Sequence, residues 1–86
     1  MPQLTETVNR RTGLIRVSGH LTAQGADLLS GTADTLRGSG HTRVTLDLTD
    51  VHDADDAGLD LLRDLGLDFA ARGGELVVRH APPPAA

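Results

Sequence analysis

Residues 44–62, VTLDLTDVHDADDAGLDLL, pass from an alternating run of apolar and polar residues, through an acidic segment, into a helical pattern. The alternation V-x-L-x-L predicts a half-buried strand over residues 43–48. Further on, the apolar residues take up helical spacing, and the helix is expected to begin at or just after residues 55–58, Asp-Asp-Ala-Gly. Its apolar stripe consists of Leu62, Leu65 and Phe69. The stretch therefore contains a strand-to-helix junction.

This junction is strongly acidic. Residues 47–68 hold eight aspartates and one arginine, Arg63. The aspartates are Asp47, Asp50, Asp53, Asp55, Asp56, Asp60, Asp64 and Asp68. Residues 49–58 are predicted to form an acidic loop between the two elements, and we expect the function to be located there.

Composition excludes several classes of function. The chain has 86 residues, a formal net charge of −4, no cysteine and no lysine. Nucleic-acid binding requires a basic patch, commonly with aromatic platforms, whereas Phe69 is the one aromatic residue here. The lack of lysine removes Schiff-base chemistry and P-loop phosphate binding. With no apolar run of membrane length and no signal peptide, the chain is predicted to be soluble and cytoplasmic, without membrane insertion.

The remaining elements follow from periodicity and turn residues. Strands are predicted at residues 4–8, 14–17, 43–48 and 75–79, and helices at residues 22–37 and from the 55–58 motif to residue 72. Thr22 is the expected N-cap of the first helix. The order ββαβαβ predicts an α/β fold with a four-stranded mixed sheet, its last three strands parallel and both helices on one face. Residues 1–80 form one domain, and the proline-rich tail 81–86 is expected to be disordered.

In this fold, residues 18–22 and 49–57 are predicted to be loops that meet at the carboxyl ends of two strands, where sites in α/β sheets are favoured. The residues of these two segments also allow other interpretations. The aspartates could simply cap a helix and keep the surface soluble. His20 and His52 could join Asp53 and Asp55 in a divalent-metal site, but their spacing is irregular, so no metal and no cofactor is predicted. Paired aspartates could serve a hydrolase, but no nucleophile accompanies them, and an enzyme is not expected.

Four segments together resemble a STAS domain of the bacterial anti-anti-sigma factor (anti-sigma factor antagonist) type. They are Gly19-His20-Leu21-Thr22, the strand VTLDL, residues 51–62, and the Gly-Gly turn into Glu75-Leu76-Val77-Val78. The resemblance covers nearly all of residues 4–80. It implies a STAS-like fold and a regulatory module without catalysis, which docks on an anti-sigma factor kinase. The kinase releases such a module by phosphorylating the first serine of an Asp-Ser-Ser-Gly-Leu signature.

The sequence departs from that signature at informative positions. Asp55 and Gly58 match it, but Asp56 occupies the phosphoacceptor position and Ala57 replaces the second serine. Thr22 stands where the family commonly has an acidic residue. Asp56 places about one negative charge where phosphoserine would carry about −1.5 to −2. The resemblance therefore predicts a built-in phosphoserine mimic, or a loop that the partner recognises without phosphorylation. The predicted partner-binding residues are Thr22, Asp53, Asp55, Asp56, Ala57 and Gly58.

The family ordinarily continues past the last strand with one or two helices, whereas a proline run follows residue 81 here. Apolar surface is therefore expected to be bare near residues 75–79 and the second helix, with a homodimer or a docking surface there. Three functional classes remain. The first is an anti-sigma-kinase-binding module. The second is a STAS subunit of an ABC-type lipid or solute transport complex, and the third is a degenerate paralogue that only dimerises.

Overall fold

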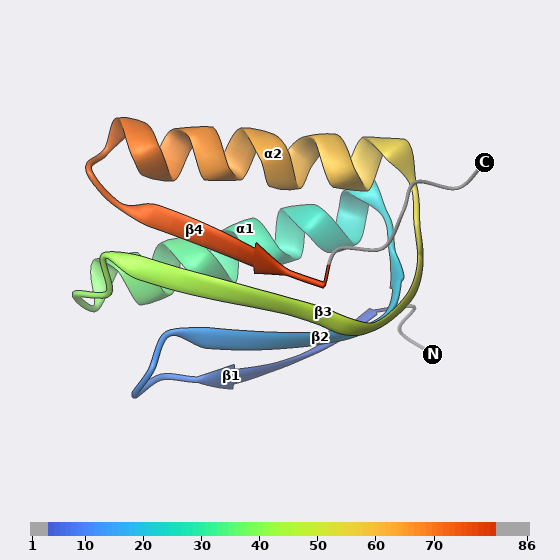
Figure 1. Ribbon diagram of the computed structural model, residues 1–86, viewed down its shortest axis with the longest axis horizontal. Helices are drawn as coiled ribbons and strands as arrows, with labels where there is room; N and C mark the ends of the chain where they lie inside the picture. Colours follow the sequence, from blue (N-terminus) through green and yellow to red (C-terminus); the bar gives the residue numbers. More distant parts are fainter. Residues whose placement is uncertain (1–3, 81–86) are drawn as a thin grey trace.

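The computed structural model describes residues 4–80. Its elements run β1 (Leu4–Asn9), β2 (Leu14–Leu21), α1 (Ala23–Gly38), β3 (Arg43–Ala54), α2 (Asp56–Ala71) and β4 (Glu75–Arg79). The four strands form one sheet in the order β1-β2-β3-β4. β1 pairs antiparallel with β2, while β2, β3 and β4 are mutually parallel. Figure 1 shows both helices on the same side of the sheet. The predicted mixed α/β sheet is confirmed, and the tail 81–86 lies outside the described residues.

Sequence periodicity explains the two layers. Alternate residues of β2 and β3, such as Ile15 and Leu46, are fully buried and face the helices. The core is aliphatic apart from Phe69, which is fully buried on α2, and no polar or charged side chain is buried among residues 4–80. The opposite face of the sheet is open and largely polar: β1, β2, β3 and β4 contribute Thr7, Arg16, Asp47 and Arg79, side by side in register.

The predicted ends of two strands were wrong. The sequence predicts strands that end at residues 17 and 48, with a loop at 49–58, but β2 continues to Leu21 and β3 to Ala54. The register between β2 and β3 shifts between Arg16 and Ser18 and again between Gly19 and His20. Each shift adds one residue to β3 and changes the spacing of its inward-facing side chains. The buried residues there are Leu48, Val51 and Ala54, three apart instead of two. The alternating pattern that marks a strand is therefore lost where the strand continues.

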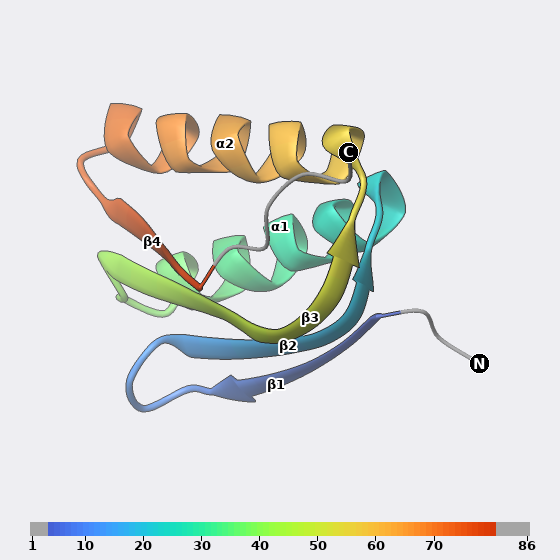
Figure 2. The ribbon, with the colours of Figure 1, turned by 45° about the vertical axis from the view of Figure 1, so that its right-hand side comes forward.

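The bulged ends of β2 and β3 curve toward the helix layer, as Figure 2 shows. This curvature carries the carboxyl ends of both strands up to the points where α1 and α2 begin. The junction between β3 and α2 is consequently short: only Asp55 separates the strand from the helix. The segment 49–58 is thus an extended strand end joined directly to a helix, and its aspartates have fixed positions.

Four large apolar side chains among residues 4–80 are exposed: Leu28 on α1, Leu61 and Leu67 on α2, and Val78 on β4. Three of them lie on α2 and β4, where bare apolar surface was expected. Leu67 lies opposite the buried stripe of α2, so the exposed side chains do not form a single patch. The predicted dimerisation stays a prediction. None of the helices in the described part of the chain has the length and apolarity to span a membrane.

Candidate functional site

The candidate site lies where β2 and β3 deliver the chain to α1 and α2. The two strands are parallel neighbours, and His20 pairs with Asp53 and Leu21 with Ala54 in the sheet register. The backbone N–H of Asp55 also donates to the carbonyl of Leu21, at 2.9 Å. Both helices therefore begin at the same edge of the sheet. This agrees with the prediction that residues 18–22 and the acidic segment lie close together.

Thr22 starts α1. Its backbone is extended, and its side-chain oxygen Oγ1 accepts a hydrogen bond from the backbone N–H of Gly25, at 3.1 Å. The carbonyl of Thr22 also accepts the N–H of Ala26, at 2.9 Å. These contacts define an N-cap and satisfy one of the otherwise unpaired donors in the first turn. The predicted capping role of Thr22 is confirmed.

Gly58, in the first turn of α2, packs directly against the start of α1. A Cβ atom at residue 58 would lie 3.0 Å from both the carbonyl carbon and the oxygen of Thr22, and 3.1 Å from the oxygen of Leu21. These are backbone atoms, so they cannot turn aside as a side chain would. Glycine is therefore required here for close approach, and this contact brings Thr22 and residues 53–58 together into one site.

Asp55 occupies the N-cap position of α2 with extended backbone, but its carboxylate makes no capping hydrogen bond. Instead, its Oδ1 lies 3.1 Å from Nε2 of His20, which donates to it when the hydrogen is on that nitrogen. Asp53 Oδ2 lies 4.0 Å from the same nitrogen, and Asp53 Oδ1 accepts from the N–H of Ala54, at 3.0 Å. The carboxylates of Asp53 and Asp55 are thus gathered around His20. The sequence indicates no ion pair of this kind, since it suggests His20 only as a candidate metal ligand and as part of the Gly19–Thr22 segment.

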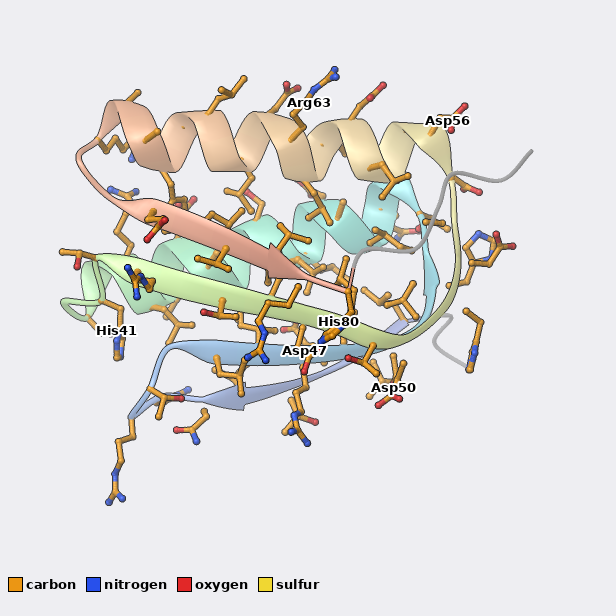
Figure 3. All side chains as sticks on the ribbon, viewed as in Figure 1. His41, Asp47, Asp50, Asp56, Arg63 and His80 are labelled. Atoms are coloured by element: carbon orange, nitrogen blue, oxygen red, sulfur yellow. The ribbon has the colours of Figure 1, made fainter. Side chains whose placement is uncertain are left out.

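Asp56 and Ala57 form the exposed start of α2. Figure 3 shows Asp56 at the first turn, pointing away from the body of the protein. A negative charge at this position is favoured by the dipole of the helix, by about 0.3–1 kcal/mol at an exposed site. Asp56 forms no ion pair with any residue of the described range 4–80. Its charge is therefore open to a partner.

The eight aspartates of residues 47–68 do not form one cluster. Asp47 and Asp50 lie on the open face of the sheet and help to line a small hollow there, well separated from Asp56 in Figure 3. Hydrogen bonds from the hydroxyl and N–H of Thr49 hold the pKa of Asp47 below its ordinary value, and the nearby charges of His80 and Arg79 act in the same direction. Asp53, Asp55 and Asp56 lie where β3 meets α2, and Asp60, Asp64 and Asp68 are distributed along α2.

We call the exposed surface formed by Thr22, Asp53, Asp55, Asp56, Ala57 and Gly58 the acidic edge. These are the six predicted partner-binding residues; Asp53, Asp55, Asp56 and Ala57 are exposed, whereas Thr22 is half-buried and Gly58 is buried. His52, the other histidine of the suggested metal site, makes no ion pair or side-chain hydrogen bond within residues 4–80. No group of three or more His, Cys, Asp or Glu side chains in that range is arranged to hold a metal ion. The chemistry of the edge is that of exposed carboxylates on a rigid frame, which suits recognition of a basic surface.

Comparison with protein families gives a match over residues 4–86 to the family described as Mlab, STAS domain. This match spans almost the whole chain. No curated protein matches the sequence.

Several solved structures match the chain, and two of them illustrate the shared fold. A crystal structure of Mglu superposes with a TM-score of 0.70 at 21% identity, and the match covers 92% of this chain but 20% of Mglu. The chain therefore corresponds to about a fifth of that protein. The STAS domain of an antisigma-factor antagonist from Rhodobacter sphaeroides superposes with a TM-score of 0.61 at 22% identity, covering 88% of this chain and 83% of the other. At such identities the likeness concerns the fold.

Proposed function

Because the chain belongs to the STAS domain family, we propose that it is a regulatory protein-interaction module that binds an anti-sigma factor kinase through the acidic edge. The observation that carries the proposal is the convergence of Thr22 and residues 53–58 on one exposed edge, fixed by the backbone contact between Gly58 and Thr22. The fold shared with an antisigma-factor antagonist supports the same class of partner. The module acts by presenting a surface and needs no reaction of its own.

Electrostatics supports a partner with a basic surface. Asp53 and Asp55 are exposed two residues apart, and His20 is the one histidine or arginine side chain within 4.0 Å of their carboxylates among the described residues. Carboxylates arranged in this way attract a positively charged partner at long range and accelerate association more than they strengthen the complex. The association rate should therefore fall steeply as salt is added, because exposed charges are screened within about 10 Å at 0.1 M.

Asp56 acts in this proposal as a permanent counterpart of phosphoserine. It stands at the first helical residue of α2, where its charge is exposed and favoured by the helix dipole. A carboxylate forms no stable phosphoester, so the charge at this position is independent of any kinase. In the family pattern, phosphorylation at this position releases the partner. The wild-type protein accordingly corresponds to the released state, with weakened binding to the kinase.

Substitution of Asp56 tests this proposal. Asp56→Ser and Asp56→Asn should bind a purified anti-sigma factor kinase from the source cell about tenfold more tightly than wild type, because both remove the phosphate-like charge. With ATP, only the serine variant should be phosphorylated at residue 56, and its affinity should return toward that of wild type. Binding is measured by surface plasmon resonance and phosphorylation by mass spectrometry.

Asp60→Asn provides the matched control, since it removes one charge about one turn farther along α2 and should leave the affinity nearly unchanged. Phosphorylation of wild-type protein on residues 49–58, or equal affinity of wild type and Asp56→Ser, would contradict the role of Asp56. Binding to an ATPase of an ABC-type transport complex, with none to the kinase, would instead establish the transport alternative.

A further inference from the structure

The net charge of the protein is confined to its helices. Together, α1 and α2 carry six aspartates and two arginines, which accounts for the whole formal charge of −4. The rest of the chain balances six acidic residues with six arginines. The helix layer therefore presents an acidic surface to solvent, while the residues outside the two helices are neutral in sum. This surface extends well beyond the acidic edge.

A groove of about 220 Å³ runs between α1 and α2. Figure 1 shows the two helices side by side over the sheet. The apolar part of the groove is formed by Ala26, Leu61 and Leu65, and its acidic rim includes Asp27 from α1 and Asp64 from α2. Leu61 is 40% exposed, although it is a large apolar residue on a helix with a well-buried stripe. The groove therefore combines an accessible apolar surface with carboxylates on both sides.

Three aspartates line the groove, Asp27, Asp64 and Asp68, and the first two differ from most of the others on the helices. Asp34, Asp60 and Asp68 each pair with an arginine three or four residues along the chain, at 3.3, 3.5 and 3.3 Å. Asp27 and Asp64 make no ion pair with any residue between 4 and 80. Within the described range, the groove therefore holds two carboxylates without an ion-pair partner, together with the exposed Leu61.

We propose that the groove between α1 and α2 binds an amphipathic helix of a partner protein, which inserts an apolar side chain against Leu61 and places arginine or lysine beside Asp27 and Asp64. Charge complementarity selects this occupant, because a second copy of the acidic helix layer, a nucleic acid or an anionic membrane would be repelled. Helix-in-groove recognition of this type uses apolar anchors at i, i+3 or i+4. The groove is separate from the acidic edge, and the inference does not depend on the function proposed for that edge.

The probe for this inference is a synthetic peptide of about 18 residues, long enough to form a helix readily, with leucines at i, i+4 and i+7 and arginines on both sides of that stripe. In titrations of the ¹⁵N-labelled protein, amide shifts should concentrate on residues 26–30 and 61–65. Asp27→Asn with Asp64→Asn should weaken binding by about fivefold or more at low salt. Leu61→Gln should weaken it by a similar factor, because the apolar anchor loses its contact.

The double variant Asp34→Asn with Asp60→Asn is the matched control, since it changes the net charge equally outside the groove and should leave the affinity within about twofold. Equal weakening by the two double variants would show non-specific attraction and overturn the inference. Shifts confined to the sheet face or the acidic edge, or a concentration-dependent dimer blocked by Leu61→Gln, would overturn it as well. Failure here leaves the kinase-binding experiment on Asp56 unaffected, so the two proposals are tested separately.

Discussion

The starts of α1 and α2 follow the same plan in sequence but are stabilised differently. Thr22 and Asp55 occupy the N-cap positions, and a glycine follows three residues later in each helix, Gly25 in α1 and Gly58 in α2. Thr22 caps its helix through the Gly25 N–H, whereas the carboxylate of Asp55 makes no cap and pairs with His20 across the edge. At the start of α1, the side chain of Thr22 stabilises the helix. At the start of α2, the side chain of Asp55 is exposed to solvent.

The difference has a physical basis in the neighbouring strands. The bulged register of β2 and β3 places His20 opposite Asp53 and close to Asp55, so the Asp55 carboxylate has an imidazole partner within hydrogen-bond distance. An N-cap side chain can therefore contact a residue from another element instead of capping its own helix. At the acidic edge, the contact with His20 keeps the carboxylate group of Asp55 exposed beside Asp53 and Asp56.

The largest expected effect on stability distinguishes the two glycines. Gly58→Ala should lower the free energy of unfolding by about 1–3 kcal/mol, because the new Cβ meets the backbone of Thr22 at 3.0 Å. Gly25→Ala is the matched control. Its Cβ would meet the end of the Leu4 side chain at 2.9 Å, which can move, and the change should stay within about 1 kcal/mol. Urea unfolding measures both, and equal effects would show that the contact at Gly58 is not a tight one.

A smaller effect on the free energy of unfolding is expected at the two N-cap residues, Thr22 and Asp55. Thr22→Ala should cost about 1 kcal/mol, the usual loss on removing an N-cap side chain, whereas Thr22→Ser should retain most of the stability. Asp55→Ala removes no capping bond and should cost less than Thr22→Ala. The comparison is made by urea unfolding at pH 7 under one salt condition. A greater loss for Asp55→Ala than for Thr22→Ala would reverse our interpretation of the two junctions.

The smallest effect concerns the pair between His20 and Asp55. Its side chains are 38% and 54% exposed, so solvent screens the interaction. A double-mutant cycle with His20→Ala and Asp55→Ala should give a coupling energy of about 0.2–1 kcal/mol that decreases as salt is added. His20→Ala should also free Asp55 to cap α2, which an NMR shift of the Gly58 amide would report. No coupling at low salt would mean that Asp55 is not held by His20.

Much of the fold was predictable from local patterns. The alternating residues of 43–48 and the helical stripe ending at Phe69 determine the elements, and their order determines a mixed sheet with both helices on one face. The N-cap role of Thr22 was also visible in the sequence, because capping is a local interaction. The ends of β2 and β3 were not visible in the sequence. The bulges place buried residues three apart instead of two, so the alternation of apolar and polar residues that indicates a strand is lost.

The sequence of this protein thus determined by itself the element order and the aliphatic core, while partner binding by the six residues of the acidic edge stays a prediction. Tertiary structure decided how those residues are used. Only the folded chain places Gly58 against the backbone of Thr22, turns Asp55 toward His20, and lines one groove with Asp27, Asp64 and Leu61. The physical reason is that periodicity and capping depend on neighbours along the chain, whereas these contacts depend on strand register and helix packing between distant segments.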